Sequence, residues 1–115
     1  MKIYIICSVR GGTPPEIEQY VHDLEAQGHI VHFPPRPSDC QQDDPTGWNI
    51  CRTHLAALKQ SDEVHVFWDV GSKGSHFDLG MAFALVKKIK LVKTYHPDNE
   101  GKSYVKVMRI WEAAF

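Results

Sequence analysis

The sequence has few cysteines and little net charge. Its three cysteines, Cys7, Cys40 and Cys51, are odd in number and form no CxxC pair, so we expect neither a disulfide framework nor a cysteine zinc site. The formal net charge of -1 excludes the basic field that holds nucleic acid, and no aromatic stacking platform replaces it. We therefore expect a reduced, cytoplasmic protein that binds no nucleic acid polymer.

Long apolar runs and repeats are also missing. The longest apolar run is far shorter than the ~20 residues needed to cross a bilayer. Met1 and Lys2 lead directly into an apolar segment, so we expect no signal peptide and no membrane partner. There are no internal repeats or low-complexity segments. The length of 115 residues and the hydrophobic content of 43% are typical of one globular domain, residues 1–115.

Strand and helix patterns alternate along the chain. Apolar runs predict strands at 2–7, 29–33, 63–68 and 89–94. The first helix is expected to have Thr13 as its N-cap and to stop at Gly28. Asp44 and Pro45 are expected to open the second helix, and the others are predicted at 75–87 and about 105–111. This order predicts an α/β fold with three αβα layers: a doubly wound, flavodoxin-like parallel sheet with strand order 2-1-3-4.

Ligands of such folds bind beyond the carboxyl ends of the strands, beside the first strand. Two glycine-rich turns lie there, SVRGG at 8–12 and DVGSKGSHFD at 69–78. Glycines let backbone N–H groups approach an oxyanion, and the next helix adds its positive end. With a hydroxyl and a guanidinium, the first turn suits a phosphate or carboxylate; the alternative is a tight turn carrying a surface arginine. The candidate residues are Ser8, Arg10, Gly11 and Gly12.

Asp78 has two interpretations. Ser75-x-x-Asp78 nearly matches a capping box, and an acid in the first turn of a helix gains from the helix dipole. The same carboxylate is expected near the SVRGG turn, and cleavage of a glycosidic bond needs a carboxylate beside an anchored sugar phosphate. From the residues alone both interpretations stay open.

The histidines give no metal site. The chain has seven, and His29 and His32 lie three apart in a predicted strand, so their side chains point to opposite faces. We expect scattered histidines, partly buried or on the surface, and no cofactor. The proline-rich stretch 34–47 is expected to be a surface loop near the site.

Three segments resemble one family. Its members have a strand that ends in Ser-x-Arg-Gly-Gly, and this chain has YIICSVRGG; their Ser-x-Gly-x-x-aromatic-Glu-Leu-Gly-x-Ala segment corresponds to SKGSHFDLGMA. A helix of the form Asp-Leu-x-x-Leu-x-x-x-Asp corresponds to HLAALKQSD. Over residues 2–92 the chain resembles the nucleoside 2-deoxyribosyltransferase superfamily, especially its 2'-deoxynucleoside 5'-phosphate N-hydrolase branch.

The resemblance implies an activity and a set of site residues. It implies an N-glycosidase or deoxyribosyltransferase that acts on a nucleoside or nucleoside 5'-monophosphate, in a homodimer or larger homo-oligomer. Asp78 falls at the family's nucleophilic glutamate, one methylene shorter, and His54 falls at an acid that helps to protonate the departing base. Further implied substrate-binding residues are Tyr4, Ser8, Arg10, Gly11, Gly12, Ser72 and Gly74.

Two other functions compete with the enzyme. The changes at Asp78 and His54 also suit a nucleotide or phosphosugar sensor that binds without turnover. A different chemistry on a related scaffold, such as flavin binding or NAD cleavage, is the third hypothesis.

Overall fold

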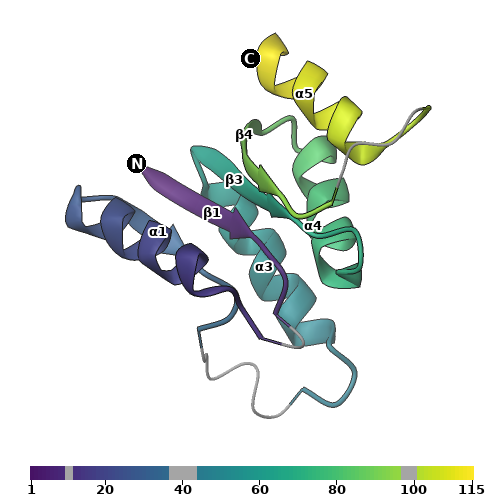
Figure 1. Ribbon diagram of the computed structural model, residues 1–115. Coiled ribbons are helices and arrows are strands. Elements are labelled where there is room, and N and C mark those ends of the chain that lie inside the picture. The colour runs from purple at the N-terminus through teal and green to yellow at the C-terminus, as the bar shows by residue number, and fades with distance from the viewer. Residues whose placement is uncertain (10–11, 37–43, 97–100) are drawn as a thin grey trace.

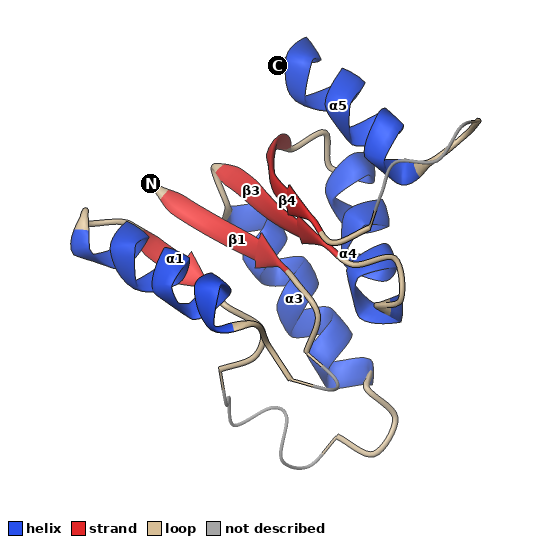
Figure 2. Ribbon diagram, in the orientation of Figure 1, coloured by secondary structure: helices blue, strands red, loops and turns tan. Residues whose placement is uncertain are grey.

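The computed structural model describes residues 1–9, 12–36, 44–96 and 101–115. Strands and helices alternate in the described chain (Figure 2). The strands are β1 (Lys2–Ile6), β2 (Ile30–His32), β3 (Glu63–Trp68) and β4 (Lys88–Thr94). The helices are α1 (Pro15–Ala26), α3 (Trp48–Gln60), α4 (Lys73–Ala84) and α5 (Tyr104–Ala114).

The strands form one parallel sheet of order β2-β1-β3-β4, as predicted. β1 and β3 lie in its centre, and their continuous apolar runs are buried because helices cover both of their faces. β4 carries one extra residue, Val92, between its partners of Val66 and Phe67, which is a β-bulge. The fold is therefore the expected three-layer, flavodoxin-like α/β fold.

The two faces of the sheet are covered unequally (Figure 1). On one face α1 packs Ile17, Val21 and Leu24 against β1, β2 and β3. On the other face α3, α4 and α5 share a single cluster, in which Met108 and Trp111 of α5 lie with buried residues of β3, β4 and α4. The face with three helices also holds Tyr4 and Asp78.

The helix ends differ in detail from the sequence expectation. Thr13 is not the N-cap of α1: Pro14 takes that place without a side-chain bond, and the Thr13 hydroxyl donates to the Ser8 carbonyl at 3.2 Å. A proline can stand at the helix start because the first N–H groups have no partner within the helix. Gly28 follows the end of α1 with a φ of +94°, which confirms the predicted stop.

The second helix begins later than predicted. α3 starts at Trp48, yet Asp44 still caps it from outside, accepting the backbone N–H groups of Gly47 at 3.1 Å and Ile50 at 2.8 Å. Among the described residues, no helix has the length and apolar character needed to cross a membrane.

Candidate active site

Tyr4 and Asp78 meet although they are 74 positions apart in the sequence. The Tyr4 hydroxyl donates to Asp78 Oδ2 at 2.8 Å. Tyr4 is 0% exposed and Asp78 is 7% exposed, so the bond is shielded from water. Burial, and then the charge of Asp78, raise the pKa of Tyr4 well above its usual range. The phenol therefore keeps its proton and holds the carboxylate in place.

Asp78 does not cap its helix. The N-cap of α4 is Ser72, whose Oγ accepts the backbone N–H of Ser75 at 3.3 Å. The helix starts two residues earlier than predicted, so Asp78 falls beyond the first turn, on the buried side of α4 with Leu79 and Ala82. The capping-box interpretation is wrong because Ser72, with extended backbone at the end of the glycine-rich turn, reaches the free N–H groups first.

His54 brings a second titratable group to the carboxylate. It lies on α3, and its Nδ1 is 3.6 Å from Asp78 Oδ1. Only 14% of the His54 side chain and 10% of the Asp78 side chain are exposed, so water screens their attraction little. The ring of His54 also stands almost perpendicular to that of Tyr4, at 79° and 6.0 Å between centroids.

His32 is part of this cluster, a place that the sequence analysis did not assign to it. It ends β2 in register with Tyr4, and the two rings stack at 4.9 Å with 19° between their planes. The ring of His54 meets that of His32 at 5.5 Å. One signal was available in the sequence: with strand order 2-1-3-4, the second strand borders the first, so its end lies beside Tyr4.

The glycine-rich turn after β1 is described in part. Arg10 and Gly11 lie outside the described residues. Ser8 follows the strand through Cys7, and Gly12 has a φ of +98°, a conformation that favours glycine. Because β1 and β3 are parallel neighbours, this turn and the one after Trp68 leave the same edge of the sheet.

The second turn supplies Ser72 and Gly74. The Ser72 hydroxyl donates to Ser75 Oγ at 2.9 Å, in addition to its capping bond. Gly74 lies in the first turn of α4, where an added Cβ would meet nothing within 4 Å, so packing within the described chain does not require glycine there. The described residues contain no group of three or more His, Cys, Asp or Glu side chains placed to hold a metal ion.

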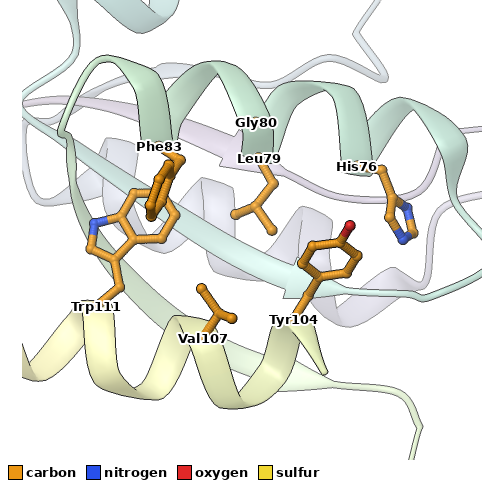
Figure 3. A pocket seen from close by; sticks show the side chains of 7 residues that line it. All are labelled: His76, Leu79, Gly80, Phe83, Tyr104, Val107 and Trp111. Atoms are coloured by element: carbon orange, nitrogen blue, oxygen red, sulfur yellow. The ribbon is translucent and has the colours of Figure 1, made fainter. Parts of the chain in front are cut away.

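An apolar groove lies elsewhere, between α4 and α5 (Figure 3). Its volume is about 260 Å³, and neither Tyr4 nor Asp78 lines it. Tyr104 and His76 face each other at one end, and Phe83 and Trp111 stand at the other (Figure 3). The groove is therefore distinct from the polar cluster around Asp78.

Two solved structures have a similar architecture. The CMP N-glycosidase BcmB of Clostridium botulinum superposes with a TM-score of 0.65 and 21% identity, over 98% of this chain and 81% of that chain. A 2-deoxyribosyltransferase of the psychrotolerant bacterium Bacillus psychrosaccharolyticus superposes with a TM-score of 0.66 and 18% identity, over 93% of this chain and 90% of that chain. The chain shares its fold with both enzymes.

Comparison of the sequence with protein-family models gave no match, and comparison with the curated proteins gave none. At this level of identity the structural likeness establishes the fold, and the chemistry has to be argued from the side chains. Those side chains are Tyr4, His32, His54 and Asp78.

Proposed function

We propose that the protein cleaves the N-glycosidic bond of a nucleoside 5'-monophosphate, releasing the base by hydrolysis or passing the sugar to another base. The observation that carries the proposal is the buried carboxylate of Asp78, held by Tyr4 at 2.8 Å and paired with His54 at 3.6 Å. The shared fold with a CMP N-glycosidase and a 2-deoxyribosyltransferase supports the same class of substrate.

In the first step Asp78 is the nucleophile. Its carboxylate oxygen bonds to C1' of the sugar while the bond between C1' and the base nitrogen breaks. The electron pair of that bond stays on the base, which takes a proton from His54 acting as the general acid. Tyr4 keeps Asp78 oriented, because its hydroxyl occupies one carboxylate oxygen and leaves the other on the His54 side.

In the second step the sugar leaves the protein. Water, or the nitrogen of an acceptor base, attacks C1', and the ester bond to Asp78 breaks to restore the carboxylate. His54, now neutral, takes the proton of the attacking group. The two steps together convert nucleotide and water into sugar phosphate and free base, with all protons accounted for.

The phosphate is assigned to the turns at the carboxyl edge of the sheet. Its proposed ligands are the backbone N–H groups and side chains of Ser8, Arg10, Gly11 and Gly12, supported by the positive end of α1. Ser72 and Gly74 are proposed to border the sugar and phosphate from the other turn. No cofactor or metal is needed for this reaction.

A nucleotide-binding protein without turnover is the second candidate. The observation that favours it is the length of the side chain at 78, since aspartate stands where the resembled family has glutamate. A carboxylate misplaced by about 1 Å can cost ~10²-fold in rate. Asp78 is also buried and bonded to Tyr4, which limits how far it moves toward a substrate.

A chromatographic assay for free base separates the two candidates. The protein and its Asp78→Asn variant are incubated with ribo- and deoxyribonucleoside monophosphates, and thermal stability is measured in the same samples. Base released by the wild type and not by the variant supports the N-glycosidase. Intact nucleotide with a raised melting temperature supports the binding protein, because a ligand of the native state stabilises it. If neither base release nor a raised melting temperature is observed, both candidates are refuted.

We also propose that the protein forms a homo-oligomer through the outer face of α4 and α5. The exposed residues of α4 beyond Lys73 are uncharged, and an all-round apolar helix is normally buried. α5 and the residue that follows it also carry large exposed apolar side chains, and Val107 of α5 lines the same groove as Phe83 of α4. A second copy would remove these side chains from water. The face comprises Phe77, Phe83, Val107, Ile110 and Phe115.

A further inference from the structure

His32 has a polar atom that the fold does not use. Its Nε2 is buried and has no hydrogen-bond partner within the part of the chain that the structure describes. A buried nitrogen without a partner destabilises a protein, and an apolar ring of similar shape would avoid that penalty. Stacking on Tyr4 needs a flat ring and no nitrogen. Within the described residues, the fold therefore makes no use of this nitrogen.

The neighbour that can use this nitrogen is His54. The two rings lie 5.5 Å apart at 77°, so His54 stands across the Tyr4–His32 stack. His54 Nδ1 is also 3.6 Å from Asp78 Oδ1, which is an ion-pair distance and longer than a good hydrogen bond. His54 therefore lies next to both a carboxylate and an imidazole and makes a short hydrogen bond to neither.

The proposed reaction ends the attraction between Asp78 and His54. Once Asp78 carries the sugar as an ester, it has no charge with which to attract His54. At that stage His54 has to accept a proton from water, and the nitrogen left for this task depends on the bond that the other nitrogen makes. A second acceptor beside His54 would hold Nδ1–H and keep Nε2 free.

We propose that His32 is a positioning residue that acts through His54: its Nε2 accepts the Nδ1–H of His54 while Asp78 is esterified. This inference rests on the proposed function and deepens it. His32 touches no reacting atom and instead keeps the general base in one tautomer during the second step. When the carboxylate is restored, His54 returns to Asp78.

The surroundings of His32 suit an acceptor. Burial, and then the neighbouring His54, lower the pKa of His32, so the ring stays neutral and keeps a lone pair. Arg36 acts in the same direction and Asp78 in the opposite one. The Tyr4 hydroxyl is engaged by Asp78 and is not a donor for His32.

Rapid-quench kinetics of His32→Phe test the proposal. Phenylalanine keeps the stack on Tyr4 and removes the acceptor. We expect the first turnover of base release to stay within about twofold of wild type, and steady-state release to fall about tenfold or more, since only the second step depends on His32 to hold the His54 tautomer. The variant should therefore show a burst of about one base per site, and the glycosylated protein should accumulate by intact mass. His22→Phe, on the exposed side of α1, is the matched control and should behave as wild type.

Equal slowing of both steps, or none, would overturn the proposal. The melting temperature shows whether the fold survives, and we expect it to equal or exceed that of the wild type because a buried unpaired nitrogen is removed.

A second measurement does not depend on turnover. In Asp78→Asn the carboxylate charge is absent, as in the ester, so His54 should turn to His32. Imidazole ¹⁵N spectra, assigned with His32→Phe and His54→Phe, should then show His32 Nε2 shifted toward a hydrogen-bonded acceptor relative to wild type. An unchanged His32 signal would overturn the proposal even if the wild type releases base. If the wild type releases no base, the proposed function fails and the spectra still decide the role of His32.

Discussion

His65 of β3 shows what an imidazole does when both of its nitrogens are used by the fold. It is buried, its Nδ1 is 2.7 Å from the Tyr20 hydroxyl, and its Nε2 is 3.0 Å from Glu63. A neutral ring satisfies both, with Tyr20 donating to Nδ1 and Nε2–H donating to Glu63. The same side chain has different partners at the other two positions. Within the described chain His32 Nε2 has no hydrogen-bond partner, and His54 Nδ1 lies 3.6 Å from Asp78 Oδ1.

The first prediction concerns acid stability. Burial lowers the pKa of His65, so the imidazole of His65 binds a proton more readily in the unfolded chain than in the folded protein. The resulting stability is complete above the unfolded pKa of about 6.5 and declines as the pH falls below it. The bond from His65 lowers the pKa of Glu63, whose contribution is lost at still lower pH.

We therefore expect the free energy of unfolding to fall between pH 7 and pH 5. In His65→Gln this slope should be shallower, by at most about 1.4 kcal/mol per pH unit. Urea unfolding across this range checks it. Identical slopes in wild type and His65→Gln would contradict the argument.

Tyr4→Phe tests the bond that orients Asp78. The substitution keeps the stacked ring and leaves a carboxylate that is 7% exposed without its donor. The expected loss is about 1–3 kcal/mol of unfolding free energy at pH 7, together with a loss of activity. Tyr104→Phe, at an exposed hydroxyl-bearing ring, serves as the control in the same urea titration. Equal stabilities of the two variants would mean that the bond contributes nothing.

At the scale of elements, α4 decides the geometry of the site. Its start at Ser72 determines which residues of the next turns face the sheet, and this places Asp78 opposite Tyr4. Its end is unusual. Val86 has a φ of +54°, while the N–H groups of Val86 and Lys87 bond back to Phe83 and Ala82. This is the Schellman arrangement, in which glycine is the favoured residue.

Val86→Gly should therefore stabilise the protein. A β-branched residue in the left-handed region is strained by roughly 1–2 kcal/mol, and part of this is regained even after the added flexibility of glycine in the unfolded chain is counted. Val86 is 65% exposed, so little packing is lost. The expected gain is about 1 kcal/mol by urea denaturation. Val86→Ala, which keeps a Cβ, should gain less, and a less stable glycine variant would contradict the strain argument.

Lys87 lies beyond the end of α4 and bonds to another helix. α4 ends at Ala84, and the Lys87 ammonium donates to the carbonyls of Lys59, at 3.0 Å, and Ser61, at 2.7 Å. It neutralises the end of α3. The interaction therefore ties two helices together, which sequence spacing could not reveal.

At the scale of the whole molecule, the polar cluster and the apolar face lie on different sides of α4. Asp78 faces Tyr4 and the sheet, whereas Phe83 and Gly80 border the groove shared with α5 (Figure 3). The proposed chemistry and the proposed assembly would therefore use different sides of one helix. Because its side chains are large and exposed, the apolar face gains free energy when a second copy covers it.

Sedimentation measures the assembly directly. The wild type is expected at a multiple of the chain mass of 13.1 kDa, and Phe83→Glu and Ile110→Glu at the monomer mass with unchanged circular dichroism, because a buried charge opposes association. Trp48→Glu, at an exposed apolar residue of α3, should leave the mass unchanged. A monomeric wild type, or equal dissociation of all three variants, would exclude this face as the interface.

The sequence by itself determined the local structure and its order. The apolar runs predicted the strands, and Gly28 predicted the end of α1. The alternation of strands and helices predicted the order of the sheet, because right-handed crossovers allow few arrangements. The resembled motifs also predicted Asp78 and His54 as site residues. The sequence did not predict their contact, because no spacing rule gives the distance between side chains on two different helices.

Only the tertiary structure decided which partner each polar group has. From the sequence, Asp78 was suited both to capping and to chemistry. In the structure Ser72 is the N-cap of α4, and the hydroxyl of Tyr4, 74 positions away, donates to the Asp78 carboxylate. The pairing of β1 with β2 places His32 beside Tyr4, and the Lys87 side chain bonds to the end of α3. Local propensities act over a few residues, whereas these contacts arise when distant elements pack together and buried polar atoms must find partners.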